Sequence, residues 1–129
     1  MVAAGALVGA RAERDVTPLH LASTAPVAKA LIRNGGDVNG RDASGATPLM
    51  NACVMGSLEV VEEIIRGGAD VTVTNNAGDT SCHLAAGWGA GDIVRSLRRA
   101  GDSCSVQNKW GLTPRDLAVE SGFAWESWQ

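Results

Sequence analysis

The segment NGRDASGATPLMNACVMGSLEVVEEIIRGGADV, residues 39–71, contains a complete helix–turn–helix pattern. Thr47 suits a helix N-cap, because its hydroxyl can accept a backbone N–H of the first turn. Pro48 suits the first helical position, where a missing N–H costs nothing. Gly56 suits a left-handed helix end. Apolar residues at i, i+1, i+4 and i+5 within 60–65 then predict the buried face of a second helix.

The same pattern returns along the chain at an interval of 33 residues. A fixed period of this length is typical of stacked helical repeats. The copy that begins at Thr17 is three residues short, because Thr17 lies 30 residues before Thr47. Five columns keep the full interval: Gly35, Gly68 and Gly101; Gly45, Gly78 and Gly111; Thr47, Thr80 and Thr113; Ala52, Ala85 and Ala118; Gly56, Gly89 and Gly122.

On these residues the chain resembles the ankyrin repeat family, whose signature contains TPLH followed by an alanine. The copies read TPLH (17–20), TPLM (47–50), TSCH (80–83) and TPRD (113–116). The resemblance implies an all-α ankyrin-repeat solenoid of stacked helix–turn–helix units joined by hairpin loops. It also implies a protein–protein interaction module, a scaffold or adaptor whose partner is another protein of unknown identity.

The register predicts a single ankyrin-repeat domain over residues 1–129. Within it Asp15 takes the place of Gly45, and aspartate tolerates a positive φ better than most residues. The opening MVAAGALVGARA has no basic residue before Arg11, so we interpret it as repeat, not as a secretion signal. The predicted parts are 1–16, the end of a preceding repeat and its hairpin; 17–40, a shortened repeat; 41–73 and 74–106, full repeats; and 107–129, an incomplete repeat or cap.

Both ends look cut, which leaves two further alternatives open. The chain could be a regulatory or targeting segment of a larger enzyme whose catalytic domain lies outside it. Copies of the chain could also stack end to end through their truncated faces, so the oligomeric state stays open.

Charge and composition argue against other classes of partner. The net charge is −3, whereas nucleic acid and anionic lipid require clustered positive charge. We expect the densest basic group, Arg95, Arg98 and Arg99, to be a solvated helix face. No apolar run approaches the ~20 residues of a membrane helix. The glycines belong to the repeat and do not form a phosphate-binding motif, so we expect no nucleic acid, no membrane and no cofactor.

The string DTSCH, residues 79–83, contains the ingredients of nucleophilic catalysis. Neighbours on one helical turn point in different directions, however, and a triad requires convergence. We therefore expect His83, like His20, to bond to nearby backbone or to a threonine hydroxyl. We predict no enzyme, no catalytic residue and no metal site, since the histidines and cysteines lack zinc-ligand spacing.

The three cysteines, Cys53, Cys82 and Cys104, cannot all pair and show no CxxC spacing. The simplest interpretation is three small buried side chains in a reducing compartment. It predicts an intracellular protein, cytoplasmic or nuclear. An enzyme that uses the Cys82 thiol is the alternative, but Leu19 and Leu49 occupy the same column and predict burial.

The resemblance implies a concave groove formed by the hairpin tips and the exposed side of the first helix of each repeat. Trp88 and Trp110 occupy positions that the fold leaves free, and tryptophan is enriched among interface hot spots. We expect Phe123, Trp125 and Trp128 to close the end of the stack instead. The predicted partner-binding residues are Val54, Met55, Asn76, Asp79, Trp88, Lys109, Trp110, Leu112 and Glu120.

Overall fold

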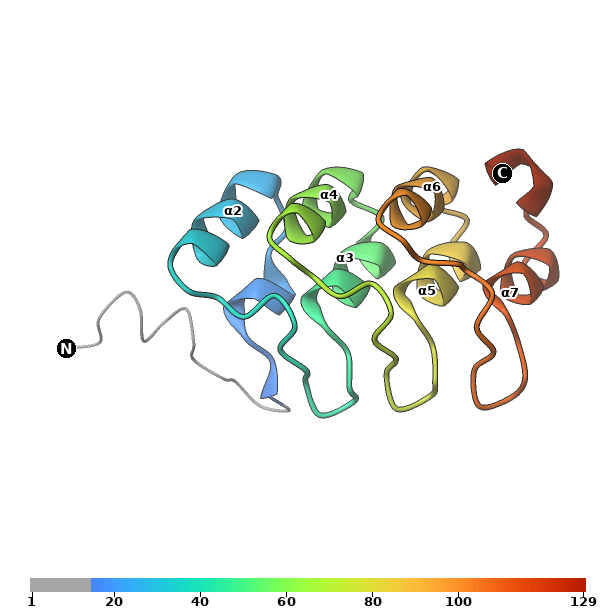
Figure 1. The fold of residues 1–129 in the computed structure, drawn as a ribbon, viewed down its shortest axis with the longest axis horizontal. Helices are drawn as coiled ribbons and strands as arrows, with labels where there is room; N and C mark the ends of the chain where they lie inside the picture. Colours follow the sequence, from blue (N-terminus) through green and yellow to red (C-terminus); the bar gives the residue numbers. More distant parts are fainter. Residues whose placement is uncertain (1–14) are drawn as a thin grey trace.

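The computed structural model describes residues 15–129, in which helices are the only regular elements. The predictions for residues 1–14, including the rejection of a secretion signal, lie outside this range. The helices form two rows, with α2, α4 and α6 in one and η2, α3, α5 and α7 in the other (Figure 1). Their bounds are η2 Pro18–Leu21, α2 Ala25–Arg33, α3 Pro48–Met55, α4 Leu58–Arg66, α5 Ser81–Gly87, α6 Gly91–Arg99, α7 Pro114–Glu120 and η3 Trp125–Trp128.

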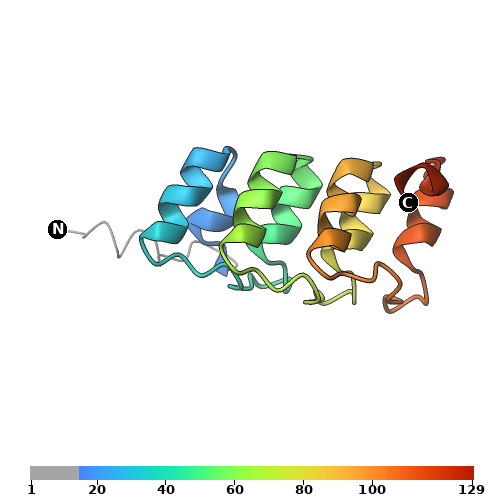
Figure 2. The same ribbon diagram turned by 45° about the horizontal axis from the view of Figure 1, so that its top comes forward.

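The helix pairs stand side by side in chain order, and the loops between them project on one side (Figures 1 and 2). This arrangement confirms the predicted all-α solenoid. A solenoid of this kind has no single central core, because each unit buries its apolar face only against its neighbours.

Threonine caps begin α3, α5 and α7, as predicted. The Thr47 hydroxyl accepts the Met50 N–H at 3.3 Å, and Thr80 and Thr113 do the same for the residues three positions on. Each of these helices is followed by a glycine with positive φ: 75° at Gly56, 78° at Gly89 and 85° at Gly122. A side chain is rarely tolerated in that conformation, which explains why the glycine column recurs.

The shortened repeat has a clipped first helix. η2 is a four-residue 3-10 helix, and α2 begins at Ala25 with Pro26 in its first turn. The three missing residues therefore come from the end of the first helix and the glycine turn. Asp15 has φ 61°, as expected for a residue in the Gly45 column.

Apolar side chains between the two rows form the core. Ile64, Ile93 and Leu97 of the second helices are fully buried. Ala52 and Ala85, from the alanine column, are also fully buried, where α3 packs against α5 and α5 against α7. A small residue at these positions allows close approach of neighbouring first helices.

The aromatic residues at the C-terminus close the stack, as predicted. Trp125 and Trp128 are buried, and η3 packs against α6 in the place of a second helix. The Trp128 ring occupies the space where a Cβ on Gly91 would stand. Phe123 packs beside Gly89 in the same way, although its side chain stays 38% exposed.

Arg98 corrects the prediction of a fully solvated basic face on α6. Its guanidinium carbon lies 4.8 Å from the centroid of the Trp125 ring, within cation–π range. Its Nη1 donates to the Trp128 carbonyl at 3.4 Å. One of the three arginines therefore holds the terminal cap, while Arg95 and Arg99 are exposed as expected.

The cysteines also require a correction. Cys82 and Cys104 form a disulfide, so they are not unpaired buried side chains. Cys53 alone matches the prediction: it is free and fully buried, and burial raises the pKa of its thiol to about 12. The bond also removes Cys82 as a free thiol nucleophile, although its predicted burial is confirmed.

Candidate protein-binding surface

The hairpin loops form a continuous ladder along one side of the solenoid. Asn76 N–H donates to the Ser44 carbonyl of the preceding loop at 2.9 Å, and Lys109 N–H donates to the Ala77 carbonyl at 3.0 Å. These bonds join equivalent positions of successive loops, so the tips keep a fixed spacing. The part of a binding surface formed by the hairpin tips is therefore preorganised.

Large apolar side chains are exposed along the row of first helices and on the tips. Trp88 is 67% exposed and Trp110 is 70% exposed. Val54 and Met55, at the end of α3, are 43% and 48% exposed. Such side chains gain from burial against a partner, and tryptophan is the type most enriched among interface hot spots.

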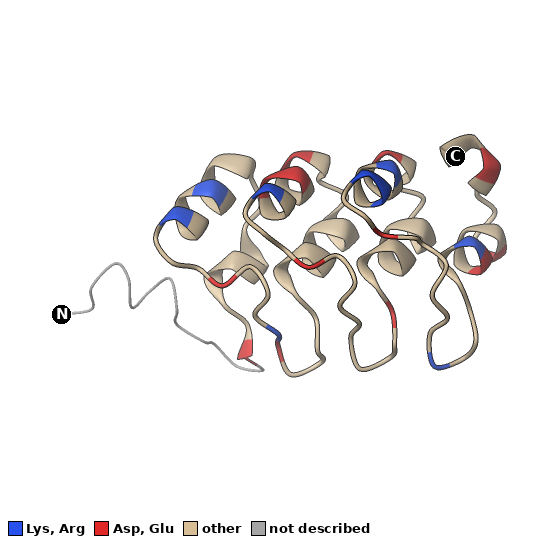
Figure 3. Ribbon diagram, in the orientation of Figure 1, with Lys and Arg blue, Asp and Glu red and all other residues tan. Residues whose placement is uncertain are grey.

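Charge is unevenly divided between the two rows of helices. α3 and α5 contain no Lys, Arg, Asp or Glu, whereas α2, α4 and α6 carry most of the charged helical side chains (Figure 3). The surface around Val54, Met55 and Trp88 is therefore apolar and uncharged in its middle. Lys109 and Glu120 are exposed near its C-terminal end.

The two histidines are structural, as predicted. His83 Nδ1 accepts the Thr80 N–H at 3.0 Å, and its Nε2 donates to the Leu112 carbonyl at 2.8 Å. His20 makes the equivalent bonds to Thr17 and to the Ala46 carbonyl. Each histidine thus ties a first helix to the next hairpin and is fully used by the fold. The catalytic interpretation of residues 79–83 has no geometric support.

A family model for ankyrin repeats, in three copies, matches residues 3–75. The chain belongs to the ankyrin-repeat family. This match includes residues before Thr17, and the geometry described above continues the ankyrin repeats beyond residue 75. A comparison with curated proteins found no match. Ankyrin repeats are generally protein–protein interaction modules and are typically non-catalytic. Between residues 15 and 129, no helix is long and apolar enough to cross a membrane.

Two of the predicted partner-binding residues form side-chain hydrogen bonds within the chain. Asn76 Nδ2 donates to the Ala43 carbonyl at 3.1 Å, and Asp79 Oδ1 accepts from Asn108 Nδ2 at 2.9 Å. Both side chains reinforce the ladder between hairpins. Leu112 is half-buried, with its carbonyl bound to His83.

Two exposed apolar residues on the same row were missed by sequence reasoning. Leu21 is 66% exposed at the N-terminal end of the described stack, whereas Leu84 in the same column is half-buried. Val119 on α7 is 55% exposed. The repeat register did not mark either residue as exposed.

Potential metal-ligating side chains within residues 15–129 come together at Cys82, Asp102 and Cys104, whose ligand atoms lie within 4.8 Å of one another. The two sulfurs are bonded to each other, so this form of the cluster offers no thiolate for a metal. Asp102 is buried, its Oδ1 accepts the Cys104 N–H at 2.8 Å, and its Oδ2 has no hydrogen-bond partner. Burial raises the pKa of Asp102, and the Cys104 N–H partly offsets the effect.

The Asp102→Asn variant is expected to be more stable than the wild type near pH 7, by on the order of 1 kcal/mol, because it removes a buried charge that lacks a partner. In acid, the Asp102 carboxyl is neutral and its burial lowers the free energy of unfolding only slightly. As the pH rises through the raised pKa, the carboxyl ionises and the free energy of unfolding falls. The difference between the two proteins should therefore vanish near pH 3. Urea unfolding across this pH range measures it, and a constant difference would contradict the assignment.

Proposed function

We propose that the chain is a scaffold or adaptor module that binds another protein in the concave groove of its hairpin tips and first helices. The observation that carries this proposal is the solvent exposure of Trp88 and Trp110, which are 67% and 70% exposed. Neither ring is needed for the core. Trp88 ends the uncharged helix α5, and Trp110 lies on the tip of the following hairpin.

The proposed contact surface has an apolar centre and a polar rim. Val54, Met55 and Trp88 form the centre on the first helices. Trp110 extends it onto a hairpin tip, and burial of such side chains supplies most of the binding energy in protein interfaces. The remaining proposed contacts are Leu112, Lys109 and Glu120, with Asn76 and Asp79 in reach but already bonded within the chain.

The Trp88→Ala/Trp110→Ala double variant is expected to bind the partner at least about 30-fold more weakly, since a buried interface tryptophan contributes ~2 kcal/mol or more. Its thermal unfolding should stay close to that of the wild type, because both side chains are exposed. Affinity purification identifies the partner, and titration with that purified partner then measures the change.

A matched control lies on the opposite row. Arg95 and Glu62 are exposed on α6 and α4, and their double alanine variant should bind like the wild type. Unchanged binding of the tryptophan variant, or equal loss in both variants, would place the partner elsewhere on the ankyrin repeats.

We also propose an intracellular location, cytoplasmic or nuclear. The free thiol of Cys53 supports it. The Cys82–Cys104 bond opposes it, because disulfides persist mainly in oxidising compartments. Alkylation of intact cells before lysis, followed by mass spectrometry of Cys82 and Cys104, tests the proposal: a chain recovered only with this bond intact would contradict it.

A further inference from the structure

The Cys82–Cys104 bond lies beside an open cleft near the C-terminal end of the solenoid. The cleft has a volume of about 400 Å³. We propose that it binds a small anionic thiol, which exchanges with the disulfide at Cys104 Sγ and opens the bond. This site is independent of the proposed protein-binding groove. The cleft is lined by Arg98, Cys104, Thr113, Arg115, Asp116 and Trp125, among others.

The repeat itself explains why the two cysteines meet. Leu49 and Val71 occupy the corresponding positions of the preceding repeat, and both lie in the core. They are separated by 22 residues, as are Cys82 and Cys104. The fold brings these two columns into the same core, and in this repeat alone both hold cysteine. The bond therefore replaces an apolar contact without any change of architecture.

The two cysteines differ in their access to the cleft. Cys104 lines the cleft and is 4% exposed, whereas Cys82 is fully buried beneath it. A thiolate that enters the cleft therefore meets Cys104 first, and Cys82 is the leaving group. Cys53 is also fully buried, so it provides an internal measure of global unfolding.

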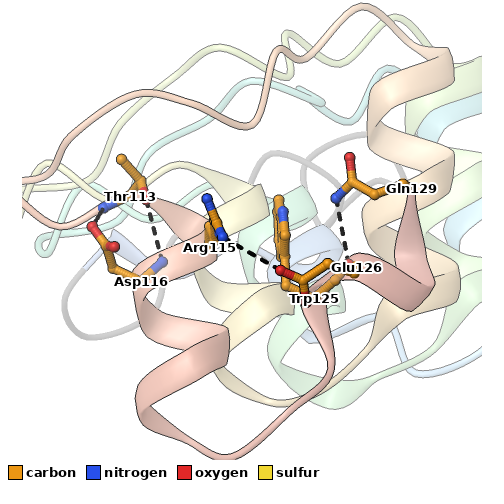
Figure 4. Close-up of polar contacts among 6 residues, drawn as sticks. All are labelled: Thr113, Arg115, Asp116, Trp125, Glu126 and Gln129. Atoms are coloured by element: carbon orange, nitrogen blue, oxygen red, sulfur yellow. Dashed lines mark hydrogen bonds and ion pairs between the residues drawn. The ribbon is translucent and has the colours of Figure 1, made fainter.

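Two guanidinium groups at the cleft can hold an anion. Arg98 and Arg115 are the basic residues of its lining, and Asp116 is the acidic one. The Asp102 carboxylate, within 4.8 Å of both sulfurs, repels an anion there, so the anionic end of the thiol has to lie at the guanidinium groups. The Asp116 carboxylate is turned to Thr113, whose N–H it accepts at 2.9 Å (Figure 4). Arg115 pairs with Glu126 at 3.4 Å, but both side chains are more than half exposed. A pair of this kind is weak in water, so a ligand anion can replace the glutamate.

Asp102 is placed to stabilise the opened state. Its Oδ2 is buried without a partner, and a carboxylate oxygen of Asp102 lies within 4.8 Å of both sulfurs. The disulfide has no hydrogen to offer this oxygen. A Cys82 thiol would have one, so opening the bond supplies the donor that the buried carboxylate lacks.

The exchange balances with thiol as the only reductant. The thiolate RS⁻ attacks Cys104 Sγ, the Cys82–Cys104 bond breaks, and Cys82 leaves as a thiolate that takes up the proton lost by RSH. A second RSH then attacks the mixed disulfide, releases RSSR and leaves Cys104 as a thiol. Two thiols are oxidised and one protein disulfide is reduced.

Three probes with the same two-carbon thiol chain test the charge preference: 2-mercaptoethanesulfonate, 2-mercaptoethanol and cysteamine. Opening is followed by alkylation and mass spectrometry at equal thiolate concentration. We expect the anionic thiol to open the bond about tenfold faster than the cationic one, since each exposed ionic contact contributes a few-fold. The preference should shrink markedly in 1 M NaCl, where the Debye length falls to about 3 Å. Equal rates at low salt would overturn the proposal.

Variants and peptide mapping complete the test. Arg115→Gln should slow the anionic thiol about two- to fivefold and leave 2-mercaptoethanol unchanged. Arg66→Gln, on the exposed end of α4, should leave all three rates unchanged. The mixed disulfide should map to Cys104. Its appearance on Cys82, or alkylation of Cys53 at the rate of bond opening, would mean that exchange requires unfolding and would overturn the site.

Discussion

Replacement of Trp128 with alanine is expected to lower the free energy of unfolding by about 3–5 kcal/mol. Trp128 is 9% exposed, and its ring centroid lies 5.7 Å from that of Trp125 and 6.1 Å from that of Phe123. The ring covers Gly91 at the start of α6. The variant would therefore expose the apolar end of the last complete repeat, which a solenoid must shield.

Urea unfolding of the purified chain measures this loss, and Trp110→Ala is the matched control. Trp110 is the same residue type at 70% exposure, so its replacement should change stability by no more than about 0.5 kcal/mol. Similar losses in the two variants would show that η3 does not cap the stack.

Replacement of His83 with alanine is expected to cost about 3–4 kcal/mol. The side chain is fully buried, and it connects the Thr80 N–H to the Leu112 carbonyl of the next hairpin. Its loss leaves a donor and an acceptor without their partner, each at ~1–3 kcal/mol, in addition to a cavity. The C-terminal hairpin should loosen first, which hydrogen exchange at the Lys109 amide would detect.

His83→Met separates the hydrogen bonds from the volume. Met50 occupies the same column in the preceding repeat and is fully buried, so methionine fits this position. The methionine variant should recover roughly half of the loss by filling the cavity, since it restores no polar contact. Equal stability of His83→Met and wild type would show that the bonds to Thr80 and Leu112 contribute nothing.

Sequence reasoning predicted the exposed tryptophans of the candidate surface but not the hydrogen bonds that its polar residues form within the chain. Trp88 and Trp110 are exposed at the positions that the repeat leaves free. Asn76 and Asp79 were expected to face a partner, yet they bond to the neighbouring hairpins. A polar side chain on a turn looks the same in sequence whether it faces solvent or the next loop, because its bonding partner lies about 30 residues away.

The sequence by itself determined the repeat length, the helix starts and ends, the shortened first repeat and the local bond of each histidine to a threonine. Each of these depends on residues within one turn or one repeat: a threonine cap, a glycine with positive φ, an apolar stripe. Local geometry of this kind is set by neighbours in the chain, so a linear pattern is sufficient to predict it.

Only the tertiary structure decided how distant columns meet. Cys82 and Cys104 look like scattered core residues until stacking brings them together, and Arg98 looks solvated until η3 places Trp125 against it. The unpaired Oδ2 of Asp102 is likewise invisible in sequence. These features depend on packing between elements 20 to 30 residues apart, where distance and burial, rather than residue type, set the chemistry.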